Sequence, residues 1–203
     1  MAGSEFNLRV ALALTDEVRE TADSVFKKAD VNLLLGELDG FTGGLKAAFE
    51  NRGEIGNLLA DLDRASTLCD GIEGGVTISH PENPEVVVGV LSVKSTALFC
   101  KGLVTLAQGK TPEALELMNE SLAVEPDQET LYHIGLIFLQ LKEERGDRGV
   151  GKALLGRRLA KMVTSGSGQE EGAIDAFRKC VEMDSESETG VRAGMELARL
   201  DQL

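Results

Sequence analysis

The chain has 203 residues and a formal net charge of −13 at pH 7, from 34 acidic and 21 basic side chains. Hydrophobic residues make up 42% of it and charged residues 27%, the proportions of a soluble globular protein. The negative charge repels phosphates, so we do not expect nucleic acid as the main partner. Aromatic residues are only 4%, so aliphatic side chains must fill the core, which suits packed helices.

The chain begins with MAGSEF, which is typical of a vector-derived leader, so residues 1–6 are left out of the fold prediction. No signal peptide and no run of about 18 apolar residues follows it, which favours a cytoplasmic location. A native targeting or anchor segment can have been lost where such a leader was added.

Helical patterns follow this leader. Apolar residues spaced by three or four predict a helix over residues 7–29, with a restart and a new cap as an alternative at Thr15. Residues 31–50 are apolar but rich in glycine. They predict helices on either side of a turn at Gly43 and Gly44.

Residues 55–70 predict another amphipathic helix, and residues 71–84 a loop that closes with SHPENP. The next stretch, residues 85–108, has strand propensity from Val86 to Val90. We nevertheless predict one long helix there, because no partner strand is evident and the apolar pattern continues into the next segment.

Residues 95–127 have the pattern of two helices joined by a tight turn. Gly109 interrupts the first apolar stripe, Thr111 is the predicted N-cap, and Pro112 is the predicted first helical residue. Pro126 ends the second helix.

This pair of helices resembles a tetratricopeptide repeat, which has a small residue in its first helix, Ala-x-x-x-Phe in its second and a closing proline. The matching residues are Gly102, Ala114 and Pro126, with Met118 in the place of phenylalanine. The resemblance implies that Ala114 lies where the two helices cross closely.

The same features recur further along the chain. Gly135 follows Gly102 by 33 residues, close to the family period of 34. Ala173 and Phe177 follow Ala114 and Met118 by 59 residues, which is one 33-residue period plus an insertion of 26. The insertion is predicted at about 143–170.

The resemblance covers about residues 95–200 and implies an all-α, right-handed array of helical hairpins. Residues 7–84 would be a helical region packing on the repeats, and residues 85–203 the repeats with their insertion. The implied function is that of a non-enzymatic scaffold or adaptor, binding a partner helix or peptide in a groove lined by the first helices. The implied groove residues are Phe99, Leu103, Leu106, Tyr132, His133, Leu136, Leu139, Gln140, Arg192, Met195 and Arg199.

An alternative is that the apolar groove residues pack beneath the N-terminal helices, which would make the chain a structural subunit. Some members of the family clamp the carboxylate of chaperone tails with lysine and asparagine. We do not expect that clamp here, because Phe99, Leu103, His133 and Glu188 occupy its positions.

Little in the sequence suggests catalysis, and no cofactor is expected. The segment Gly146–Lys152 nearly fits a phosphate-binding loop, so a small nucleotide-binding switch protein is the alternative function. The match lacks the hydroxyl that holds magnesium, because Ala153 stands in its place, and it follows a helical pattern instead of a strand.

The three cysteines and two histidines show no metal-ligand spacing, and no nucleophile motif is present. We expect Cys69, Cys100 and Cys180 to be buried free thiols in a reducing compartment.

The predicted insertion is basic, with six basic residues and one acidic residue between positions 145 and 161, a net charge of +5. Its centre, KALLGRRLAKMV, has the pattern of a short amphipathic helix. It can neutralise the protein's own acidic surface, dock an acidic partner, or contact an anionic membrane surface. We expect the insertion to be dispensable for folding, because it interrupts the repeat between two helices and leaves the spacing of the repeat residues within each helix unchanged. The basic residues are Arg145, Arg148, Lys152, Arg157, Arg158 and Lys161.

Overall fold

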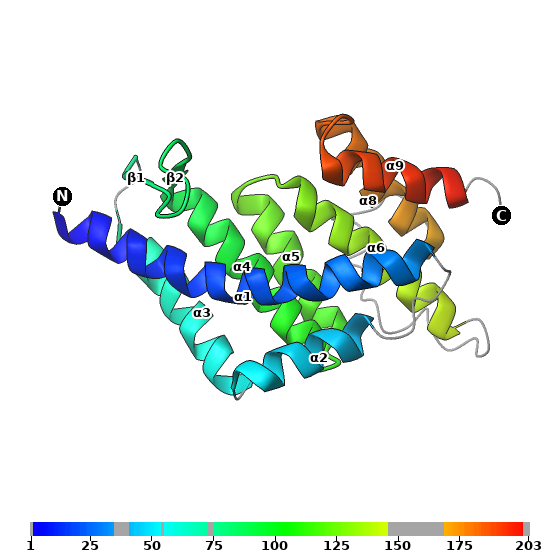
Figure 1. The fold of residues 1–203 in the computed structure, drawn as a ribbon, viewed down its shortest axis with the longest axis horizontal. Coiled ribbons are helices and arrows are strands. Elements are labelled where there is room, and N and C mark those ends of the chain that lie inside the picture. Colours follow the sequence, from blue (N-terminus) through cyan, green and yellow to red (C-terminus); the bar gives the residue numbers. More distant parts are fainter. Residues whose placement is uncertain (1, 35–40, 54, 73–74, 146–168, 201–203) are drawn as a thin grey trace. The chain divides into compact units, whose positions relative to one another are not determined.

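The computed structural model describes residues 2–34, 41–53, 55–72, 75–145 and 169–200. Most of these residues are helical, which confirms the predicted all-α class (Figure 1). The chain divides into two compact units, Met1–Glu125 and Pro126–Leu203, hereafter the N-terminal unit and the C-terminal unit.

Helix α1 (Ala2–Leu34) is continuous and longer than the predicted 7–29. It does not restart at Thr15. The buried Thr15 hydroxyl donates to the Leu12 carbonyl of the same helix, 2.7 Å away, so it does not cap a new helix. Residues 2–6, which fall in the predicted leader, are also helical and are part of α1.

Helix α2 (Phe41–Arg52) contains Gly43 and Gly44, so the predicted turn at these glycines is wrong. A Cβ on Gly44 would lie 3.0 Å from Cγ1 of Val25 in α1. The glycine therefore lets α2 approach α1 closely, and Phe49 of α2 is fully buried.

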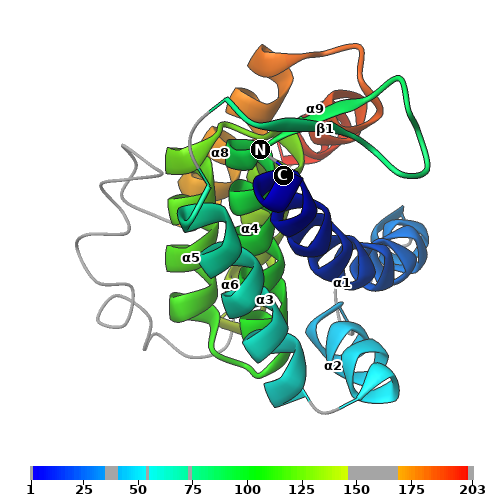
Figure 2. The same ribbon diagram turned by 90° about the vertical axis from the view of Figure 1, so that its left-hand side faces the viewer.

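Helix α3 (Ile55–Asp70) has the predicted bounds. It packs against α1 and against α4 (Val90–Ala107), and Figure 2 shows α3 alongside α4. The amphipathic pattern thus identified the helix and its bounds. The buried residues of α3 are Leu58, Leu62, Ala65 and Cys69.

The predicted helix over residues 85–108 is wrong at its start. Strand β2 (Val87–Gly89) pairs antiparallel with strand β1 (Thr77–Ser79), and α4 begins only at Val90. The partner strand β1 lies inside the predicted loop. It has only three residues, too few for an alternating apolar pattern to reveal a strand in the sequence. Burial of Ile78 holds this hairpin to the unit.

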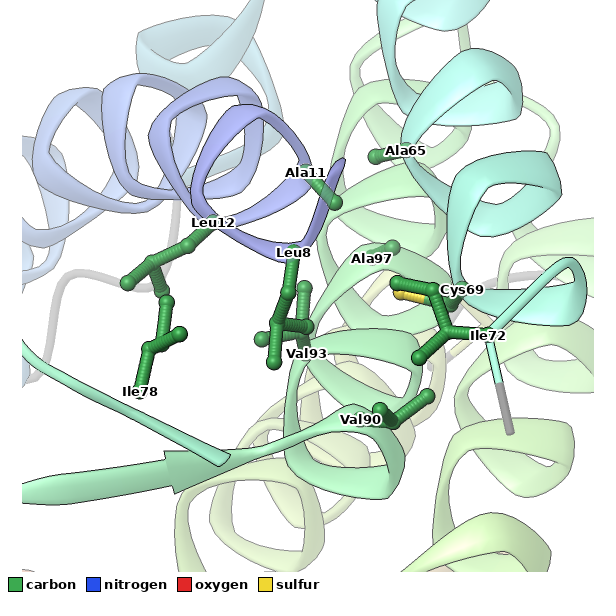
Figure 3. Close-up of a cluster of buried hydrophobic side chains, with 10 residues drawn as sticks. All are labelled: Leu8, Ala11, Leu12, Ala65, Cys69, Ile72, Ile78, Val90, Val93 and Ala97. Carbon is green, nitrogen blue, oxygen red and sulfur yellow. The ribbon is translucent and has the colours of Figure 1, made fainter. Parts of the chain in front are cut away.

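One buried cluster joins α1, α3, α4 and the hairpin (Figure 3). Leu12 of α1 points toward Ile78 of β1, and Leu8 points toward Val93 of α4. The N-terminal helices therefore share a core with α4. The ten residues of the cluster are Leu8, Ala11, Leu12, Ala65, Cys69, Ile72, Ile78, Val90, Val93 and Ala97.

Helix α5 (Thr111–Val124) packs back on α4 through the predicted tight turn. Gly109 has a φ of +76°, a left-handed conformation that favours glycine. Thr111 is not the N-cap that we predicted. The cap position is Lys110, which makes no side-chain capping hydrogen bond, and Thr111 is the first helical residue.

Helices α4 and α5 cross closely at Gly102. A Cβ on this residue would lie 2.9 Å from Cγ of Met118 and 3.1 Å from the carbonyl oxygen of Ala114. Both of these residues are fully buried. Glycine at position 102 therefore lets the two helices approach closely.

Replacing Ala114 with leucine should destabilise the chain by about 1–3 kcal/mol, because the close crossing has no room for a larger side chain. Ala123 lies exposed on the same helix, so Ala123→Leu is the matched control and should unfold like the wild type. Urea denaturation followed by circular dichroism measures both. Equal stability of the two variants would contradict the crossing at Ala114.

The C-terminal unit consists of α6 (Gln128–Arg145), α8 (Gln169–Met183) and α9 (Glu188–Leu200) in the part that the structure describes. Helices α6 and α8 cross at Gly135, where a Cβ would lie 2.5 Å from Cε1 of Phe177. Helix α9 packs on α8.

Side chains fasten the start of α6 to the turn between α8 and α9. Gln128 Nε2 donates to the carbonyls of Cys180 and Asp184, at 2.7 and 2.6 Å. Ser187 Oγ donates to Gln128 Oε1 at 2.7 Å and accepts from the Gly190 N–H at 2.9 Å, which caps α9. These bonds fix the turn against α6.

Candidate functional site

The predicted groove residues of the first repeat lie inside the N-terminal unit. Phe99, Leu103 and Leu106 are 3%, 0% and 1% exposed. Helix α4 packs against α1, α2, α3 and α5, so helices of its own unit surround it. This burial agrees with the alternative prediction that these apolar residues pack beneath the N-terminal helices.

The groove residues predicted on α6 are also buried. His133 Nδ1 lies 2.7 Å from the Glu129 carbonyl oxygen of the preceding turn. The Tyr132 ring packs against Phe177 of α8, with ring centroids 5.7 Å apart. These residues thus contribute to packing. The buried set is Tyr132, His133, Leu136 and Leu139, while Gln140 lies on the same helix and its side chain is outside the description.

The groove residues predicted on α9 reach the surface. Met195 is 60% exposed. Arg192 pairs with Glu188 at 2.5 Å, and Arg199 pairs with Glu196 at 3.3 Å. The structure therefore divides the predicted groove into buried residues on α4 and α6 and accessible residues on α9.

Most of the predicted basic insertion lies outside the described residues. Arg145 is the last residue of α6. The loop Gly146–Lys152 also lies outside, so the nucleotide-binding alternative and the roles of the insertion stay predictions. The basic residues that fall outside are Arg148, Lys152, Arg157, Arg158 and Lys161.

A histidine–carboxylate pair that the sequence did not reveal joins the hairpin to α1. His80 Nε2 lies 3.4 Å from Asp16 Oδ2, and His80 Nδ1 accepts from the Glu82 N–H at 3.2 Å. Burial raises the pKa of Asp16, against the attraction of His80. Both ring nitrogens have partners, so this pair suits a structural link better than proton transfer to a substrate.

The three cysteines are buried free thiols, as predicted. Burial raises the pKa of Cys180 to about 12 and that of Cys69 to about 11. Cys100 Sγ donates to the carbonyl of Thr15 at 3.7 Å. A thiol with a raised pKa carries little of the nucleophilic thiolate at neutral pH, so Cys69 and Cys180 are poorly suited to act as nucleophiles.

We expect all three thiols to resist a disulfide reagent such as DTNB at pH 8 in the folded chain and to react together in 6 M guanidinium. Burial slows the reaction of all three thiols, and the raised pKa slows it further at Cys69 and Cys180. Absorbance at 412 nm measures the released thiolate. Rapid reaction of even one thiol in the native protein would contradict the described burial.

Among the described residues, no group of three or more histidine, cysteine or acidic side chains can hold a metal ion. Helix α4 is, of the described helices, the one long and apolar enough to cross a membrane. Its residues are 67% buried in the structure, and the core helix of a soluble protein meets the same criteria.

No family model, no curated protein and no solved structure matches the chain. The tetratricopeptide resemblance therefore depends on the spacing of the repeat-like residues along this chain and on the contacts between its own helices.

Sequence reasoning missed two sets of exposed apolar residues, one in each unit. It assigned Val86 and Val87 to the helix over residues 85–108, but they lie before α4, and their side chains are 44% and 66% exposed. It also did not foresee that α9 turns Val191 outward, 44% exposed. The spacing of Val191 and Met195, four residues apart in a predicted helix, was the available signal.

Proposed function

We propose that this chain is a non-enzymatic protein-interaction module, a scaffold or adaptor built from tetratricopeptide-like helical hairpins. One recurring contact carries the proposal. Gly102 meets Met118 in the N-terminal unit, and Gly135 meets Phe177 in the C-terminal unit. The glycines are 33 residues apart and the large residues 59 apart, the offsets of a repeat with an insertion.

Such repeats stack by burying a common core and leave one surface for a partner. The resemblance assigns that surface to the first helix of each repeat, here α4, α6 and α9. Because the described stripes of α4 and α6 are buried, we expect a partner helix or peptide to engage α9 first. Contact with α4 would require displacement of α1, α2 or α3.

Hydrogen–deuterium exchange on a purified complex tests the proposal, after capture of the partner from a lysate. We expect exchange to slow in α9 on binding and to stay unchanged in α5. Protection confined to α5, or binding of labelled ATP or GTP with magnesium in place of a protein, would contradict the proposal. The nucleotide result would support the switch alternative.

A further inference from the structure

Helix α9 has apolar residues on two sides. Its inward side carries Ala193 and Leu200, which are buried. Its outward side carries Val191 and Met195, 44% and 60% exposed, followed by the exposed Ala198. Spacings of four and three residues place these three side chains in one stripe along the helix. We call Val191, Met195 and Ala198 the outer stripe.

Four charged residues follow one flank of the outer stripe at spacings of four, four and three residues. They are Glu188, Arg192, Glu196 and Arg199, so the order along the helix is acidic, basic, acidic, basic. Glu188 is the most accessible of them, with its side chain 81% exposed. Read from the other end, the order is basic, acidic, basic, acidic.

This order is complementary to itself when two α9 helices pack antiparallel. A two-fold axis perpendicular to the helices brings the same flank of each copy together, running in opposite directions. With the axis between Ala193 and Gly194, Glu188 lies opposite Arg199 of the second copy. The same axis brings Val191 and Met195, and likewise Arg192 and Glu196, to within one residue of directly facing positions. In a parallel two-fold pair, this flank would instead lie opposite the other flank of the second copy.

We propose that the outer stripe of α9 binds the outer stripe of a second copy of this chain, as an antiparallel two-fold helix pair. A helix of 13 residues is about 20 Å long and about 10 Å wide. That face is smaller than the roughly 800 Å² per partner of a stable interface. The dimer is therefore weak and depends on concentration.

This inference rests on the apolar and charge pattern of α9 and goes beyond binding of a different protein. Sedimentation velocity of the full chain, from about 1 μM to 1 mM, measures self-association without any other partner. Failure of the dimer would thus leave the proposed function standing, and failure to find a partner would leave the dimer standing.

The expected result is a reversible monomer–dimer equilibrium. Met195→Glu should raise the dissociation constant at least tenfold, because it introduces a charge into the outer stripe. Met183→Glu is the matched control. This methionine at the end of α8 is 47% exposed but lies outside the stripe, so its variant should dimerise like the wild type.

Charge reversal tests the orientation. Glu188→Arg and Arg199→Glu should each weaken the dimer, and the double variant should restore it, because both Glu188–Arg199 pairs across the dimer are then reversed and stay opposite in charge. Circular dichroism checks that each variant keeps its helices. A monomer at 1 mM, growth beyond a dimer, an unaffected Met195→Glu variant or no rescue in the double variant would overturn the proposal.

Discussion

Gly190→Ala should be the most damaging single methyl addition in the C-terminal unit. A Cβ on Gly190 would overlap the carbonyl oxygen of Asp184, a backbone atom that cannot rotate away. The turn between α8 and α9 would have to move, which would break the bonds from Gln128 to the carbonyls of Cys180 and Asp184. We expect a loss of about 3 kcal/mol or more.

Urea denaturation followed by circular dichroism measures this loss. Gly194→Ala is the control on the same helix, since the nearest atom to its new Cβ is Cγ2 of Val181 at 4.0 Å, an ordinary contact. That variant should be neutral or stabilised by up to about 1 kcal/mol through helix propensity. Similar stabilities of the two variants would contradict the described turn.

Gly135→Ala should destabilise the crossing of α6 and α8 by about 1–3 kcal/mol. The new Cβ would lie 2.5–2.8 Å from three carbon atoms of the Phe177 ring. The ring is fully buried, so it has no open space into which to rotate. The helices would have to separate, and the packing of Tyr132 on Phe177 would change.

A double-mutant cycle with Phe177→Leu makes this prediction specific. The smaller side chain leaves a cavity in the wild type but gives room to the alanine. Phe177→Leu should therefore be less harmful in the Gly135→Ala background, with a coupling energy of about 0.5–3 kcal/mol. Additive effects would show that the two positions are not in contact.

The helix pairs could be predicted because close crossings leave a signal at fixed spacing. Gly102 with Met118, and Gly135 with Phe177, combine a small residue with a large one on neighbouring helices. Gly44 shows the limit of the same reasoning. Gly44 lies inside α2 and faces Val25 of α1, where its small size allows close packing. The sequence prediction instead assigned it to a turn.

The candidate site was predicted less well, because periodicity identifies an apolar face without showing what covers it. The stripes with Leu103 on α4 and Met195 on α9 look alike in the sequence. The first is fully buried and the second is 60% exposed. The pairing of His80 with Asp16 and the strand pairing of Ile78 depend on tertiary contacts that no local pattern encodes.

The contacts of the C-terminal unit join chain segments on opposite sides of residues 146–168. Phe177 of α8 packs on α6, and Gln128 at the start of α6 holds the carbonyls of Cys180 and Asp184. Peptide continuity between these segments lowers the entropic cost of bringing α8 to α6. A chain nicked in this interval, or supplied as two fragments that end and begin there, would reassemble from its non-covalent contacts. Between two intact chains, the same contacts would permit exchange of the α8–α9 segment.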